Sequence, residues 1–159
     1  MSQPDARTML RHTLATVAYR GGKAVRGAAD DFASFRASDS SRTPAQILAH
    51  IGDLFDWALS IAKGAQRWQD SAPLPWEQEI ARFFTSLGAL DAYLTSGSPI
   101  RFDPGRVFQG GIADALTHTG QLAMLRRLGG YKMKGESYAQ ADIVIGRVGL
   151  EQTPADPRY

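Results

Sequence analysis

The chain has 159 residues, a length typical of one domain with a substantial apolar core, and we therefore predict a single domain over 1–159. Its formal net charge is only +2, and a chain with 43% hydrophobic and 21% charged residues is neither disordered nor strongly basic. The absence of cysteine excludes disulfides, thiolate metal sites and a cysteine nucleophile.

Two helices are predicted in the first part of the chain. The first covers about 4–29, because a proline at position 4 suits a first helical turn and apolar or small residues then recur on one face, at Leu10, Leu14, Val17, Gly21 and Val25. The second covers about 43–63. It begins with Thr43 as a capping residue and Pro44 at the first helical position, ahead of a second apolar stripe.

Two more helices are predicted after a proline-rich break. The segment 75–95 has the clearest helical period, formed by Trp76, Ile80, Phe83, Phe84, Leu87, Leu90 and Leu94. A stretch rich in glycine, serine and proline separates it from a fourth helix at about 106–128. Gly129 and Gly130 are expected to end this last helix.

The fold class follows from these four amphipathic segments. Each of them has to bury one apolar face, which favours an all-α protein built as a four-helix bundle. Residues 131–159 lack a comparable period and contain several glycines and prolines, so we predict an irregular C-terminal arm. No internal repeat interrupts this organisation.

The fourth predicted helix has polar residues on the face that should be buried. At 100° per residue one stripe contains Val107, Gly111, Asp114, His118, Gln121 and Leu125. Asp114 and His118 are thus neighbours one turn apart, and His50 of the second helix lies at the edge of an apolar stripe, so that its ring should point inward. Two imidazoles and one carboxylate suit Zn²⁺, Ni²⁺, Fe²⁺ or Mn²⁺ and leave a coordination position open.

Periodicity alone leaves an alternative open at this site. Asp114 and a histidine four residues later also form an ordinary pair on a helix surface, and only the inward direction of His50 favours a metal. His12 lies opposite its own apolar stripe and is expected to be solvated. Asp53 is a minor alternative ligand, whereas the helical angle turns Asp56 away from the core.

Two segments carry a family resemblance. Residues 108–130, FQGGIADALTHTGQLAMLRRLGG, and residues 43–57, TPAQILAHIGDLFDW, resemble the two ligand-bearing helices of the DinB/YfiT-like metalloprotein superfamily of bacteria. The resemblance implies that His50 is the first metal ligand and His118 the last. The usual middle histidine of the family falls on Asp114, a departure that affects metal choice and affinity more than metal binding itself.

The resemblance also implies a type of activity. Members with a known activity use a low-molecular-weight thiol, as in bacillithiol S-transferases and mycothiol-dependent maleylpyruvate isomerase. We therefore expect a metal-dependent transferase or isomerase that acts on a small-molecule substrate, with Zn²⁺ or Ni²⁺ ahead of Fe²⁺ or Mn²⁺. The alternatives are a hydrolase that uses metal-activated water, a non-catalytic bundle held together by the metal, and a small-ligand-binding protein. The resemblance further implies a homodimer.

Four other residues are candidates for the site. Gln121 could hydrogen-bond a ligand, Trp57 could form a wall of the pocket, and Tyr19 is a third catalytic candidate. Arg126 could attract an anionic cosubstrate. Each has an ordinary structural alternative: a satisfied amide for Gln121, a core position for Trp57 and a solvated helix-end charge for Arg126.

Membranes and nucleic acids are not expected partners. No apolar run approaches the roughly 20 residues that cross a bilayer, and the N-terminal segment MSQPDARTML does not have the form of a secretory signal. We therefore predict a cytoplasmic protein. The charged residues form no basic stripe with interleaved aromatic residues, which makes a nucleic-acid-binding module unlikely.

Overall fold

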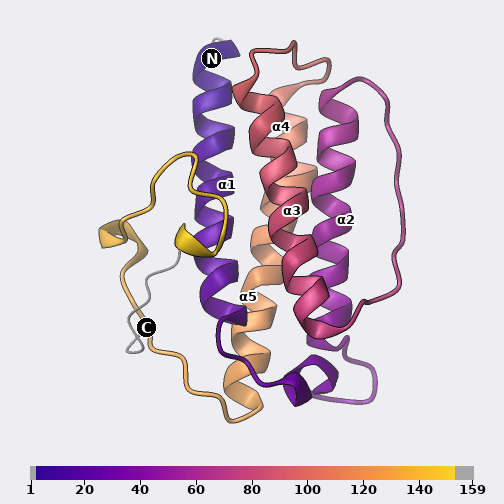
Figure 1. The fold of residues 1–159 in the computed structure, drawn as a ribbon, viewed down its shortest axis with the longest axis vertical. Helices are drawn as coiled ribbons and strands as arrows, with labels where there is room; N and C mark the ends of the chain where they lie inside the picture. The colour runs from indigo at the N-terminus through magenta and orange to yellow at the C-terminus, as the bar shows by residue number, and fades with distance from the viewer. Residues whose placement is uncertain (1–2, 153–159) are drawn as a thin grey trace.

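The computed structural model describes residues 3–152, and every regular element within that range is helical (Figure 1). The long helices are α1 (Gln3–Val25), α2 (Pro44–Ala62), α3 (Trp76–Thr95) and α5 (Ala113–Leu128). They pack against one another, so the predicted all-α fold with four bundled helices is confirmed. None of the helices in the described range is both long and apolar enough to cross a membrane.

The fourth helix of the bundle is a rod of three consecutive pieces. α4 (Pro104–Val107) continues through η2 (Phe108–Ile112), a single widened π-helical turn, into α5. The rod begins two residues before the predicted 106–128. Asp103 caps it, because its carboxylate accepts a hydrogen bond of 2.9 Å from the backbone N–H of Arg106.

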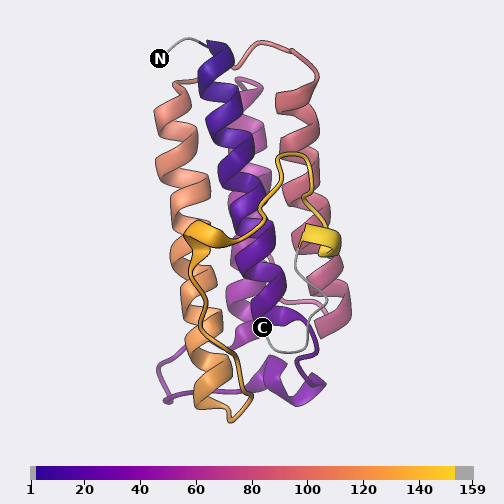
Figure 2. The same ribbon diagram turned by 90° about the vertical axis from the view of Figure 1, so that its left-hand side faces the viewer.

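The order of the helices around the bundle places α2 between α3 and α5. α1 packs against the same two helices from the other side, so α1 and α2 are diagonal neighbours (Figures 1 and 2). α2 and α3 run parallel, and the segment 63–75 that joins them travels along the outside of the bundle from one end to the other (Figure 1). This connection passes over the outer face of α2.

The C-terminal arm is irregular, as predicted, over the part that the structure describes. After α5 it contains only two short 3₁₀ turns, η3 (Tyr138–Gln140) and η4 (Leu150–Gln152), and it crosses α1 (Figure 2). The remainder of the predicted arm, 153–159, lies outside the described residues.

A complete capping box begins α2. The hydroxyl of Thr43 accepts a hydrogen bond of 3.2 Å from the backbone N–H of Gln46, and the side-chain oxygen of Gln46 accepts one of 2.9 Å from the backbone N–H of Thr43. Pro44 occupies the first helical position, where no N–H donor is needed. The start of this helix was therefore readable from the sequence.

The predicted end of the first helix at Ala29 is wrong by one turn. α1 ends at Val25, and Gly27 then adopts a positive φ of 62°. Arg126 of α5 reaches the open end of α1 and donates to the carbonyl oxygens of Lys23, Ala24 and Arg26, at distances of 2.7 to 3.1 Å. These bonds satisfy carbonyls that a helix end leaves without partners, so a residue a hundred positions away stabilises the end of α1.

Two glycines let α2 and the fourth helix approach closely. A Cβ added to Gly111 would lie 2.7 Å from the Cβ of Ala58, and one added to Gly110 would lie 2.8 Å from the ring of Trp57. Real Cβ atoms do not approach other heavy atoms this closely, so the backbone of the fourth helix reaches the side chains of Ala58 and Trp57 only because these two residues have no side chain.

Replacement of Gly111 by alanine should therefore destabilise the protein. Overpacking against Ala58 is expected to lower the free energy of unfolding by about 1–3 kcal/mol. Gly120→Ala is the matched control: Gly120 lies in α5 with open space around it, and alanine there should stabilise by up to about 1 kcal/mol. Urea denaturation of both variants measures these changes, and a Gly111→Ala protein as stable as wild type would contradict the close contact.

Candidate metal centre

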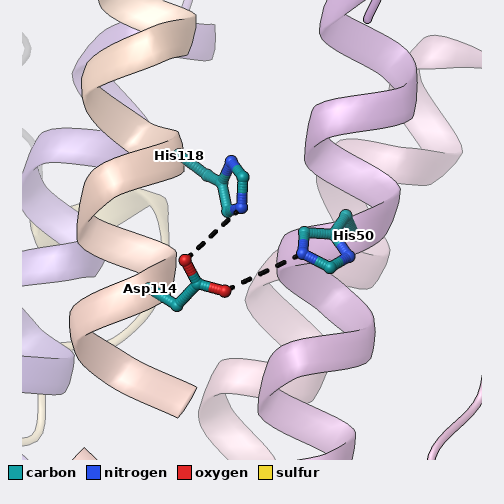
Figure 3. A group of neighbouring side chains, drawn as sticks. All are labelled: His50, Asp114 and His118. Carbon is teal, nitrogen blue, oxygen red and sulfur yellow. Dashed lines mark ion pairs between the residues drawn. The ribbon is translucent and has the colours of Figure 1, made fainter. Parts of the chain in front are cut away.

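Three potential metal ligands meet at the contact between α2 and α5. His50 is on α2, and Asp114 and His118 are one turn apart on α5 (Figure 3). Nε2 of His50 lies 3.9 Å from one carboxylate oxygen of Asp114, and Nε2 of His118 lies 3.6 Å from the other. One ligand atom from each residue lies within 4.8 Å of the other two, so the group could hold a metal ion.

The spacing of these atoms is close to that of a coordination sphere. Ligands at about 2.0–2.1 Å from a tetrahedral ion lie about 3.3 Å from one another. The separations of 3.6 and 3.9 Å, which run to the two different oxygens of the Asp114 carboxylate, exceed this value by about 0.3 and 0.6 Å, and the ligand atoms of the three residues lie within 4.8 Å of one another. Side-chain rotations would therefore have to bring all three atoms onto one ion. Two imidazole nitrogens and one carboxylate oxygen also form a donor set that suits borderline divalent cations, so the residues fit a metal.

A hydrogen bond orients His118 for coordination. Its Nδ1 lies 2.7 Å from the side-chain oxygen of Gln121, one turn further along α5. Because an amide oxygen only accepts, Nδ1 carries the proton, and Nε2 keeps its lone pair on the side of Asp114. Metal-bound histidines in proteins are typically held in this way by a hydrogen bond from the second ring nitrogen. Gln121 thus contacts a candidate metal ligand.

The environment of His50 favours its neutral form. Burial lowers the pKa of the imidazole, and coulombic repulsion from His118 and Arg42 lowers it further. The carboxylates of Asp114 and Asp53 raise the pKa of His50, but the lowering by burial and by these two neighbours is larger. A histidine must be neutral to bind a metal, so this shift prepares His50 for coordination near neutral pH.

Two aromatic contacts fix the plane of the His50 ring. The ring of His118 meets it edge to face at a centroid distance of 4.7 Å. On another side Trp68, from the crossover segment 63–75, meets it in the same manner at 5.7 Å. His50 is therefore held between α5 and the crossover segment.

Two cavities adjoin His50. One, which we call the apolar cavity, measures about 540 Å³, and its lining includes Arg42, Ile47, His50, His118, Gln121, Met124 and Leu125. The other, the polar cavity, measures about 180 Å³ and is lined in part by Arg42, Asp53 and Ser71. A small molecule in the apolar cavity would contact both candidate histidine ligands.

Asp53, the predicted alternative ligand, has a different role. Its buried carboxylate accepts hydrogen bonds of 2.8 Å from both the backbone N–H and the hydroxyl of Ser71, and it pairs with Arg82 of α3. These bonds attach the crossover segment to α2. Asp56 is half-exposed near Arg82, and His12 is exposed, as the helical angles predicted.

The remaining candidates are occupied elsewhere in the bundle. Trp57 packs on Gly110, and Arg126 caps α1 through the three carbonyl bonds described above. The hydroxyl of Tyr19 bonds Glu136 of the arm at 2.9 Å, beside an ion pair of 2.6 Å between the same carboxylate and the buried Lys23. Arg126 thus connects α5 to the end of α1, and Tyr19 connects α1 to the C-terminal arm.

Sequence reasoning missed two residues at this site. Arg42 immediately precedes the cap of α2, and its proximity to His50 along the chain was a signal that could have been used. Trp68 lies in an aperiodic segment, and nothing in its local sequence indicates that the segment folds back over α2.

No model of a known protein family, no curated protein and no solved structure matches the chain. The resemblance to the DinB/YfiT-like superfamily is therefore not supported by these comparisons. The function has to be argued from the geometry of His50, Asp114 and His118 and of the adjoining cavities.

In the metal-free protein, His50 should titrate below the ordinary imidazole value of 6.5. Between the lowered value and 6.5 the unfolded chain binds more protons than the folded one, so this residue's contribution to stability decreases as pH falls through that window. Nitrogen-detected NMR titration measures the folded value. The substitution His118→Asn should raise the pKa of His50, because it removes one source of repulsion. A pKa of His50 at or above 6.5 in the wild-type protein would contradict this description of its surroundings.

Proposed function

We propose that the protein is a metal-dependent enzyme that activates a low-molecular-weight thiol for transfer to, or isomerisation of, a small electrophilic substrate. The observation that carries this proposal is the position of His50, Asp114 and His118 beside a cavity large enough for a small molecule. A divalent ion held by these residues would lower the pKa of a coordinated thiol or water and supply an anionic nucleophile near neutral pH.

The protein's own side chains define the geometry of this reaction. His50 and His118 each offer Nε2, Asp114 offers a carboxylate oxygen, and Gln121 keeps His118 in the required tautomer. Three protein ligands leave at least one position for a reactant. In a transfer, the thiol loses its proton, its sulfur forms the bond to carbon, and the leaving group departs with the electron pair of the broken bond. In an isomerisation the same carbon–sulfur bond breaks again later.

The choice of a thiol rests on the inferred family. We infer membership of the DinB/YfiT-like superfamily, supported by the four-helix architecture and by candidate ligands on the second and last bundle helices. Because the chain contains no cysteine, the sulfur would come from a cosubstrate. Asp114 in place of the usual histidine removes one positive charge from the occupied site, which favours harder ions within the borderline group. A homodimer is part of the same inference.

A purely structural metal is the less favoured alternative. Structural zinc sites are normally closed by four protein ligands, whereas this group offers three beside an open cavity. A hydrolase that uses metal-activated water would need the same three residues, and thiol binding at the metal distinguishes it from a thiol-dependent enzyme.

The untagged protein should bind one equivalent of Zn²⁺ or Ni²⁺, and loss of any one ligand should abolish stoichiometric binding. His50→Ala, Asp114→Ala and His118→Ala each remove a third of the donor set, and two remaining donors hold an exchangeable ion weakly. Plasma mass spectrometry after dialysis measures the content. His12→Ala is the control, because His12 is exposed and outside the group, and it should retain the metal. A metal-free wild type would refute the proposal.

A thiol should bind at the metal itself if the thiol-dependent function is correct. Addition of 2-mercaptoethanol to Co²⁺-loaded protein is expected to produce thiolate-to-cobalt charge-transfer absorption. Ethylene glycol, which has oxygen in place of sulfur, serves as the control ligand and should produce none. Retention of cobalt without any new absorption on thiol addition would favour the hydrolase over the thiol-dependent enzyme.

A further inference from the structure

We propose that Arg42 makes the apolar cavity a binding site for a carboxylate-bearing small molecule with an apolar body. The inference rests on the proposed function, because it names the chemistry of the reactant that would lie beside the metal ligands. Arg42 lines both cavities that flank His50, and its charge acts on that residue.

The backbone on both sides of Arg42 is fixed. Upstream, the hydroxyl of Ser41 accepts hydrogen bonds of 3.1 Å from the N–H groups of Ala37 and Ser38 and donates one of 2.9 Å to the carbonyl oxygen of Ser38. Downstream, Thr43 is held in the capping box of α2. A short turn and a helix start therefore position the arginine where it lines both cavities.

The guanidinium of Arg42 has no protein partner. Within residues 3–152 no hydrogen bond or ion pair engages it, whereas Arg82 is paired with acids and Arg126 with helix carbonyls. Its N–H groups form a planar fork that matches the two oxygens of a carboxylate. An unpaired fork at the edge of a cavity is available for a ligand carboxylate.

The other walls of the cavity define the rest of the ligand. Ile47, Met124 and Leu125 provide apolar surface, and no acidic residue is part of the described lining that would repel an anion. A divalent ion bound by His50, Asp114 and His118 would give the site a net charge of +1. The carboxylate of Asp114 cancels one of the ion's two charges, and the two neutral imidazoles carry none. Together with Arg42 this makes the cavity electropositive, so an anionic group at one end and an apolar body are complementary to it.

Calorimetric titration of the zinc-loaded protein tests the inference with two matched probes. 3-Phenylpropionate should bind, and its neutral amide, 3-phenylpropionamide, should bind about tenfold more weakly or worse. Arg42→Gln should weaken carboxylate binding by about tenfold and remove the preference for the acid, with zinc content unchanged. Arg106→Gln removes the same charge at an exposed position that lines neither cavity, and it should leave both affinities unchanged.

The outcomes separate this inference from the proposed function. Zinc content is measured on the same samples, so a zinc-free wild type overturns the proposed function before any probe is added. A zinc-loaded protein whose affinity for 3-phenylpropionate is the same with and without Arg42 overturns the inference alone. Equal weakening by Arg42→Gln and Arg106→Gln would also overturn it, because the effect would then be one of overall charge.

Discussion

The close packing of α2 against the fourth helix is the contact on which the rest of the structure depends. Gly110 and Gly111 let the backbone of the rod approach the side chains of Trp57 and Ala58, because neither glycine has a side chain of its own. Asp114 and His118 follow these glycines on the fourth helix, and His50 lies on α2 ahead of the two residues that the glycines contact. The cluster of potential ligands therefore forms between the same two helices that the glycines bring together.

The crossover segment completes the site from the opposite side. Parallel α2 and α3 require a connection as long as the bundle, and Asp53 fastens that connection to α2 through Ser71. Trp68 is thereby brought against the ring of His50. The Asp53 carboxylate can be buried because Ser71 and Arg82 satisfy its charge and hydrogen bonds. A polar network therefore positions Trp68 against His50, where helical packing alone would not bring it.

Local signals in the sequence were sufficient for the helices and for the candidate ligands. Capping residues and apolar periods identified four helices, and the polar stripe with His50 identified the group that could hold a metal. What escaped prediction depends on contacts between distant residues. Arg126 caps the end of α1 from a hundred positions away, and Trp68 reaches His50 only because its segment folds back. The widened turn η2 is likewise invisible to a fixed period of 100° per residue.

That widened turn has an evolutionary consequence. A π-helical turn holds about one residue more than an α-helical turn, so the additional residue is absorbed within η2 (Phe108–Ile112) and the α-helix continues beyond it. Asp114 and His118 lie just beyond this turn. Removal of one residue from η2 would return the turn to α-helical geometry while both side chains keep their direction toward His50. A change of one residue in the length of this helix could thus be accommodated at η2 without loss of the cluster.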